Sequence, residues 1–189
     1  MVPYNTKISR WVRVLILCAL ALLAFACLST EEATAPEWEV RQGEGFSFAY
    51  PPDWEFNELD APEPGEAYTL FMPDQEAGTN IVVLRNPNPL EGPSDLEEKM
   101  VAGLENSAGF TLAGSPEVER IPVAGGEGVK IRYAAEAGAG GKRLEGYQVG
   151  TLLPDGQAVA VTMSVFDEAH QEDAEAVFEQ VVESLEVLK

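Results

Sequence analysis

Alternation of aromatic and smaller residues marks the segment Gly45–Phe56, GFSFAYPPDWEF, as the start of a folded domain. The alternation from Phe46 to Tyr50 has the period of two that a half-buried β-strand requires. Pro51–Pro52 ends this strand, because proline has no N–H to donate to a β-ladder. Trp54 follows and is well placed to close one end of a core. We expect the remaining strands to build a sheet outward from Phe46–Tyr50.

Short apolar segments predict further strands on both sides of this one. An edge strand is expected at Trp38–Gln42, and the acidic, proline-bearing segment Glu55–Gly65 is expected to be a loop. Ile81–Leu84 is apolar at every position, which predicts a central strand covered on two sides. Pro154–Gly156 predicts the turn of a hairpin near the end of the chain. The other predicted strands are Tyr68–Met72, Asn80–Arg85, Val118–Val123, Gly128–Ala135, Arg143–Leu153 and Gln157–Val165.

Two segments have the three- and four-residue apolar spacing of amphipathic helices. The first is predicted to begin at Ser94, with Glu97 completing a capping box, and to end at Gly109. Its apolar face consists of Leu96, Met100, Val101 and Leu104. The second is predicted to run from Asp167 to about Leu185. Its apolar face consists of Ala174, Val177, Phe178, Val181, Val182 and Leu185.

The last predicted strand has two different faces. Val159, Val161, Met163 and Val165 form the first of them. The second face holds only small residues, Ala158, Ala160, Thr162 and Ser164, and this predicts a helix packed closely against it. Strands, a helix, antiparallel strands and a closing helix together predict an α+β domain, an antiparallel β-sheet flanked by helices.

The amino terminus has the pattern of a secretory signal peptide. A basic start is followed by the apolar segment Val12–Ala26, with small residues at Ala24 and Ala26. Cys27 comes next, and this arrangement resembles a bacterial lipoprotein signal, although Ala24 stands where that family prefers leucine. The resemblance implies cleavage before Cys27 and a diacylglycerol on its sulfur. We therefore predict lipidation of Cys27.

Two alternatives to lipidation remain open. A conventional signal peptidase could cut after Ala26, or Val12–Leu28 could stay as an uncleaved anchor, although it is short for a full span. All three versions place the domain outside the cytoplasm. The predicted organisation is a signal peptide at 1–26, a lipidated cysteine and flexible tether at 27–37, and one domain at 38–189. The predicted location is the extracytoplasmic face of the cell membrane.

The charge of the chain narrows its choice of partners. The 189 residues include 12 basic and 32 acidic side chains. Three of the basic residues and none of the acidic ones lie in residues 1–26. The remainder therefore has nine basic and 32 acidic residues, a net charge of −23. This excess repels nucleic acid and anionic lipid head groups, so membrane contact requires the anchor at Cys27. No cysteine follows Cys27, which excludes an internal disulfide or a thiolate metal cluster in the domain.

Two segments carry a resemblance to a known family. Gly45–Phe48 leading into Tyr50–Trp54, and a closing helix that ends Val181–Leu185, resemble the PsbP-like superfamily across about residues 38–188. This is the α/β/α sandwich shared by the photosystem II protein PsbP, the Ran-binding Mog factor and bacterial lipoproteins. The resemblance implies a binding or assembly module at the cell envelope. It supplies no catalytic or metal-binding residues to transfer.

Residues that could support catalysis or metal binding have structural interpretations instead. His170 is the only histidine and we expect it to be an exposed helical residue. Gly138–Lys142, GAGGK, lacks the spacing of a phosphate-binding loop and predicts a hairpin turn. Two acidic clusters, Asp53, Glu55, Glu58 and Asp60 near Trp54, and Asp167, Glu168, Glu172 and Asp173, are expected to be solvated surface.

The sequence therefore predicts a non-catalytic binding or assembly module, without a cofactor or metal, tethered to the membrane and partnered by another envelope protein. A domain that binds a small ligand or a divalent cation in a pocket beside Trp54 is the alternative, and an enzyme of unrecognised type is the third.

Overall fold

The computed structural model describes residues 37–59, 65–73, 79–107, 109–138, 141–166 and 170–188. The predicted signal peptide, Cys27 and most of the tether lie outside these residues, as do Asp60, Asp167 and Glu168. No helix in the described part of the chain is long and apolar enough to cross a membrane.

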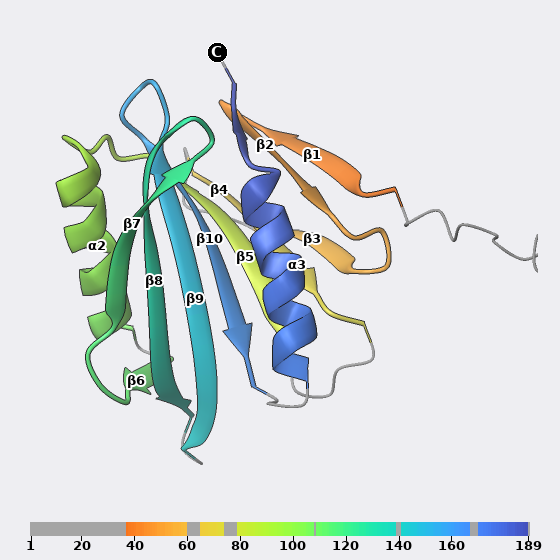
Figure 1. The fold of residues 1–189 in the computed structure, drawn as a ribbon, viewed down its shortest axis with the longest axis vertical. Helices are drawn as coiled ribbons and strands as arrows, with labels where there is room; N and C mark the ends of the chain where they lie inside the picture. Colours follow the sequence, from red (N-terminus) through yellow and green to blue (C-terminus); the bar gives the residue numbers. More distant parts are fainter. Residues whose placement is uncertain are drawn as a thin grey trace, which may run out of the picture. The chain divides into compact units, whose positions relative to one another are not determined.

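Two antiparallel sheets and two helices make up the described domain (Figure 1). The large sheet has the order β3-β4-β5-β10-β9-β8-β6, and β7 also pairs with β8. Its strands are β3 (Glu55–Leu59), β4 (Glu66–Phe71), β5 (Asn80–Asn86), β6 (Phe110–Leu112), β7 (Glu117–Val123), β8 (Gly126–Ala137), β9 (Lys142–Leu152) and β10 (Ala158–Val165). The helices are α2 (Pro93–Glu105) and α3 (Gln171–Glu183). The α+β class with antiparallel strands is thus confirmed.

A separate small sheet holds the aromatic segment at the start of the domain. It has the order β1-β2-β11, with β1 at Glu39–Gly43, β2 at Phe46–Tyr50 and β11 at Glu186–Val187. The prediction that one sheet grows outward from Phe46–Tyr50 is therefore wrong. The aromatic residues of β2 are buried against the face of the large sheet, so they join the two sheets through packing rather than through a ladder.

One face of the large sheet is covered by both α3 and the small sheet. Tyr68 on β4 lies with its ring centroid 5.9 Å from Phe48 and 5.7 Å from Phe56. Phe178 of α3 packs against Tyr147 of β9, with the ring centroids 6.0 Å apart. Trp54 is buried in the same cluster, as predicted. Ala174, Phe178, Val181, Val182 and Leu185 are buried there, so the predicted packing role of the last helix is confirmed.

The opposite face of the large sheet carries α2. Leu96, Met100 and Leu104 are buried in one cluster with side chains of β8. That cluster includes Val129, Ile131, Tyr133 and Ala135, which alternate with the residues of β8 that face α3. Figure 1 shows α2 running along the β7–β8 side of the sheet. The helix therefore covers only part of this face.

Several predicted boundaries differ from the structure. Glu55–Leu59 was expected within a loop but forms β3, paired with β4 from Glu55↔Phe71 to Leu59↔Ala67. The segment forms a strand because this places the apolar ring of Phe56 against Tyr50, with the ring centroids 5.2 Å apart. The short strand β6 was not predicted, and α2 ends at Glu105 with Asn106 as its cap, not at Gly109.

The predicted capping box at Ser94 is also wrong. The helix begins at Pro93, with Gly92 at the N-cap and no side-chain cap. Proline suits the first helical position because its fixed φ is helical and its missing N–H would have no partner there. The Ser94 hydroxyl instead accepts a hydrogen bond from Arg120 at 3.0 Å, and Glu97 forms an ion pair with Arg120 at 3.2 Å.

Two glycines of β9 allow close packing on the α2 face. A Cβ at Gly146 would lie 2.1 Å from Cζ of Tyr133, whose ring therefore lies directly over the strand. A Cβ at Gly150 would lie 2.6 Å from Sδ of Met100 on α2. Met100 is flexible, whereas the Tyr133 ring is rigid and buried. The two positions therefore differ in how well they can accept a methyl group.

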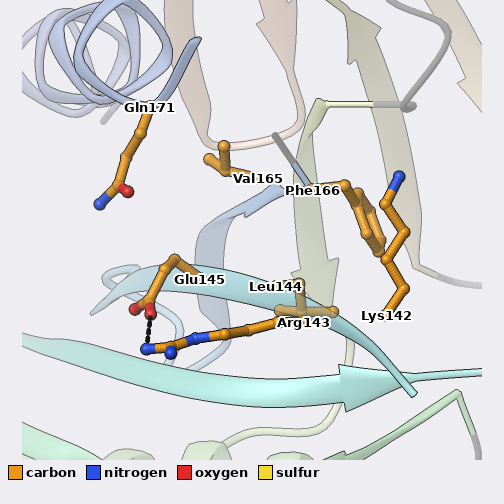
Figure 2. A pocket seen from close by; sticks show the side chains of 7 residues that line it. All are labelled: Lys142, Arg143, Leu144, Glu145, Val165, Phe166 and Gln171. Atoms are coloured by element: carbon orange, nitrogen blue, oxygen red, sulfur yellow. Dashed lines mark hydrogen bonds and ion pairs between the residues drawn. The ribbon is translucent and has the colours of Figure 1, made fainter. Parts of the chain in front are cut away.

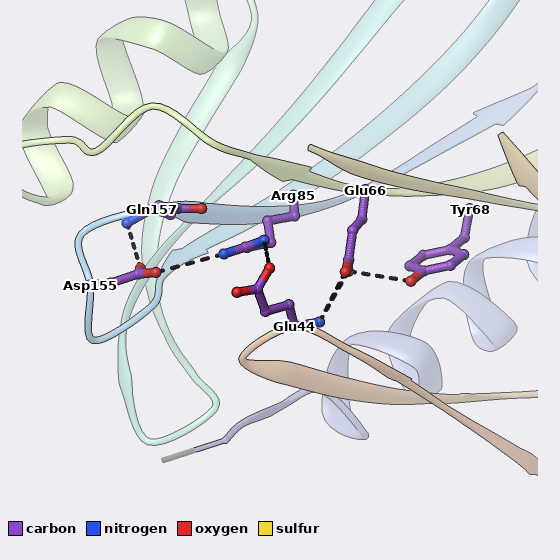
Figure 3. Close-up of polar contacts among 6 residues, drawn as sticks. All are labelled: Glu44, Glu66, Tyr68, Arg85, Asp155 and Gln157. Carbon is purple, nitrogen blue, oxygen red and sulfur yellow. Dashed lines mark hydrogen bonds and ion pairs between the residues drawn. The ribbon is translucent and has the colours of Figure 1, made fainter. Parts of the chain in front are cut away.

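Arg85 is a buried cation that connects two turns at the same end of the sheets (Figure 3). Its guanidinium lies 2.6 Å from Glu44, in the β1–β2 turn, and 3.7 Å from Asp155, in the β9–β10 turn. The backbone N–H of Glu44 donates to Glu66 of β4 at 3.1 Å, and the Tyr68 hydroxyl donates to the same carboxylate at 3.3 Å. These contacts hold the small sheet against the large one.

We expect Glu44→Gln combined with Asp155→Asn to destabilise the protein more than Arg85→Met does. The double variant leaves a buried guanidinium without a counter-charge, a change that costs about 3–5 kcal/mol when a buried pair is broken. Arg85→Met removes the charge itself and leaves two carboxylates that are already exposed to water. Urea unfolding of both variants gives the order, and the reverse order would show that Arg85 is not held as a buried charge.

We expect Gly146→Ala to lower the free energy of unfolding by about 1–3 kcal/mol, the usual cost of overpacking a core. Gly150→Ala, on the same strand and face, should cost less because Met100 can adopt another rotamer. Thermal and urea unfolding of the two alanine variants measure this difference. Equal stability of Gly146→Ala and the unmodified protein would contradict the placement of the Tyr133 ring.

Candidate functional site

A cleft of about 400 Å³ lies beside α2, on the part of the sheet that the helix does not cover. Its floor is the small-residue face of β10, where Ala160, Thr162 and Ser164 are each only partly buried. The prediction that a helix packs closely on all of these residues is therefore wrong. Only Ala158 of the four is fully buried, in the same cluster as the apolar face of α2.

Leu84 of β5 shows most directly that this part of the sheet is open. Its side chain is 42% exposed, although β5 is a central strand. The register Leu59↔Ala67↔Leu84↔Ala160 places these residues on one face of the sheet. Phe71, four residues after Ala67 on β4, faces the same side and is exposed, as is Leu59. The predicted double-sided cover of Ile81–Leu84 holds for Ile81 and Val83 but not for Leu84.

One end of the cleft is lined by aliphatic side chains. Leu84, Leu90, Leu96 and Met100 line it, above Ala160. Asn86 is the amide at this end, and its side-chain oxygen already accepts a hydrogen bond from the backbone N–H of Asn88 at 2.9 Å. This end therefore offers dispersion contacts and an apolar surface to a ligand.

Hydroxyl and amide groups line the other end of the floor. Thr162 and Ser164 point to the α2 side of β10, and Gln148 lies opposite Thr162 on β9. The Gln148 amide nitrogen donates to Oγ1 of Thr162 at 3.0 Å. The hydroxyl proton of Thr162 remains able to donate, because this bond uses only an oxygen lone pair. The side-chain oxygen of Gln148 is buried without a hydrogen-bond partner.

Tyr133 forms the wall at this polar end. Its ring stacks on Phe110 with the centroids 5.6 Å apart, and Ser164 lies near its hydroxyl. Burial raises the pKa of the Tyr133 hydroxyl, and the contact with Ser164 offsets this only in part. Tyr133 is therefore a neutral hydrogen-bonding wall residue, not a base, at physiological pH.

The cleft contains little charge. Lys99, on the exposed side of α2, is the one ionisable side chain other than Tyr133 among its lining residues. Paired carboxylates, a histidine and a cysteine are therefore all missing from this lining. The lining thus offers apolar contacts and hydrogen-bonding hydroxyl and amide groups.

A second recess, of about 370 Å³, lies near the β8–β9 hairpin (Figure 2). Arg143 is paired with Glu145 at 3.0 Å, and the Lys142 ammonium lies 5.4 Å from the centre of the Phe166 ring. Both cations of this recess thus have partners within the chain. Gly138 and Gly141 have positive φ in the turn that joins β8 and β9, so the described part of the GAGGK segment is a hairpin turn, as predicted.

The other residues singled out in the sequence are not brought together. Asp53, Glu55 and Glu58 are exposed, and Glu58 is paired with Arg41 at 2.9 Å. His170 is partly buried at the N-cap of α3, rather than exposed within the helix. No group of three or more histidine, cysteine or acidic residues in the described ranges could hold a metal ion. The cleft lies on the opposite face of the sheet from Trp54, so it is not the pocket that the sequence led us to expect beside Trp54.

Sequence reasoning missed every residue of the cleft. Two features of the sequence pointed to the cleft. Leu84 extends an apolar segment, and the small residues Ala160, Thr162 and Ser164 alternate with larger apolar residues along β10. Both were interpreted as surfaces covered by a helix. The sequence could not show that α2 lies over β8 and β9 and stops short of β10 and β5.

No family model and no curated protein matches the chain. Several solved structures do. The solution structure of cyanobacterial PsbP (CyanoP) from Synechocystis sp. PCC 6803 is 14% identical, covers 84% of this chain and 97% of its own, and has a TM-score of 0.59. LpqN of Mycobacterium tuberculosis, described as involved in cell envelope biogenesis, is 13% identical over 83% of this chain and 88% of its own, with a TM-score of 0.48.

At these identities the similarity to CyanoP, which has the higher TM-score of the two, establishes the architecture alone. Almost the whole length of CyanoP is matched, and the match agrees with the PsbP-like resemblance noted in the sequence around Phe46–Trp54. The chain has a PsbP-like fold.

Proposed function

We propose that this chain is a lipoprotein of the extracytoplasmic face of the cell membrane, anchored through Cys27, and that it acts as a non-catalytic binding or assembly module. Its binding site is the cleft between α2 and the β5–β10 floor. The exposure of Leu84 on a central strand is the observation that carries this proposal, because such a position is normally covered.

The anchoring part of the proposal is supported by the amino-terminal sequence. Ala24 and Ala26 precede Cys27 after an apolar segment, which is the arrangement that signal peptides require. Cys27 is also the last cysteine of the chain. The strong negative charge of the domain supports an anchor as well, because the domain itself is repelled by anionic lipids.

A larger partner is the second candidate for the binding site. The exposed side chains of Leu59 and Phe71 continue the apolar surface from Leu84 across β4 and β3. An envelope protein that docked on this surface would cover both the cleft and its surroundings. A divalent cation is not favoured, since the described residues offer no suitable group of ligands.

We expect the protein extracted from membranes of the producing cell to have the mass of a chain that begins at Cys27 and carries a diacylglycerol. Intact-mass measurement tests this, with Cys27→Ser as the control that should retain its signal peptide or be released unmodified. A mature protein whose Cys27 bears no lipid would contradict the anchoring proposal but not the proposal that the cleft is a binding site.

We expect a photo-reactive phenylalanine analogue at Leu84 to form adducts in native membranes, because this position lies at the open side of the cleft. Val118 on β7 is the matched control, since it is also an aliphatic strand residue, is 39% exposed and does not line the cleft. Adducts at position 84 well above those at 118 support the cleft as the binding site. Equal yields at the two positions would refute it.

A further inference from the structure

We propose that the occupant of the cleft is an uncharged, single-chain amphiphile, with its aliphatic chain at the Leu84–Leu90 end and a hydroxyl- or carbonyl-bearing head at Thr162 and Ser164. Monoacyl glycerol esters and alcohols of short to medium chain length belong to this class. The inference rests on the proposed binding role of the cleft and adds the chemistry of the ligand.

The volume of the cleft sets the size of the ligand. At roughly 30 Å³ for each water-sized group, a space of about 400 Å³ accommodates on the order of 13 non-hydrogen atoms. A single chain of medium length with a small head satisfies this limit. A lipid with two acyl chains would leave most of its apolar surface in water.

The apolar end favours a flexible aliphatic chain over a rigid ring. Leu84, Leu90 and Leu96 surround this end, and Met100 adds a thioether that adapts to irregular shapes. Ala160 keeps the floor low beneath them, so the chain can lie along β10. The aromatic side chains that would stack on a planar ligand, Phe110 and Tyr133, stack on each other at the opposite end.

The polar end suits a head that both accepts and donates hydrogen bonds. The Thr162 hydroxyl can donate, because it already accepts from Gln148. Ser164 retains unused acceptor capacity beyond its contact with Tyr133. A hydroxyl or ester head meets both requirements, whereas a purely apolar molecule would leave the Thr162 donor and the spare Ser164 acceptor unmatched.

The charges around the cleft favour a ligand without net charge. A cationic head would find no carboxylate in the lining, where the only ionised side chain is Lys99. An anionic head would meet Lys99, but this residue is exposed and the chain after residue 26 has nine basic against 32 acidic residues. Fatty acids and quaternary ammonium amphiphiles should therefore bind less well than a neutral amphiphile of equal chain length.

The test uses the full chain reconstituted in phosphatidylcholine vesicles with 1-hexanoylglycerol that carries a diazirine in its acyl chain. We expect the label to fall on residues that line the cleft. Unlabelled 1-hexanoylglycerol should compete about tenfold better than hexanoate or hexyltrimethylammonium, a preference equivalent to about 1.4 kcal/mol.

Leu84→Glu should reduce labelling because it places a carboxylate at the apolar end, and Val118→Glu should leave it unchanged. Both substitutions are at exposed strand positions, so both proteins are expected to fold. Ala160→Trp, which fills the floor, provides a second test, with Ala176→Trp on the exposed side of α3 as its control. Retained thermal unfolding temperatures show that the variants are folded.

The outcomes separate the ligand class from the binding role. Label outside the cleft, or equal competition by the charged amphiphiles, would overturn the neutral-amphiphile inference. If position 84 also captured a protein in membranes, the binding role would stand with a different occupant. If neither experiment marked the cleft, both the inference and the proposed function would fail.

Discussion

The structure depends on the burial of one face of the large sheet beneath two different layers. The small sheet supplies Phe46, Phe48 and Tyr50, and α3 supplies Phe178 and its apolar neighbours. β11 follows α3 directly and pairs with β2, so the carboxyl end of the domain is joined to its first strands. Loss of this double layer would expose most of the aromatic core at once, which makes it the main source of stability.

The opposite face is covered by a single helix, and this asymmetry explains where a ligand can bind. Gly146 and Gly150 let Tyr133 and Met100 lie close to β9, so α2 is drawn toward β8 and β9. The floor formed by β10 and β5 then stays open beside the helix. Glycines of β9 thus permit close packing on one side of the cleft, and the small residues of β10 leave space on its other side.

Local patterns in the sequence predicted most helices and strands but not which sheet or layer each of them joins. The alternation in β2 and the apolar spacing in α3 reflect burial, so both elements were predicted from neighbouring residues alone. Membership of β2 in a separate sheet depends on long-range pairing with Glu186–Val187, which no local pattern encodes. β3 was missed for a similar reason, because Phe56 is its one strongly apolar signal before Leu59. Cys27, the predicted lipidation site, has only its sequence context to support it.

The most direct test of the account is the accessibility of the cleft in the cell. Ala160→Cys places a thiol on its floor, and Ala176→Cys places one on the exposed side of α3. Maleimide labelling, assigned to individual peptides by mass spectrometry, compares the purified protein with intact cells. An occupied cleft predicts that position 160 reacts when purified but is protected in cells, while position 176 reacts in both. Equal reaction of position 160 in both settings would contradict the central claim that the cleft is a binding site.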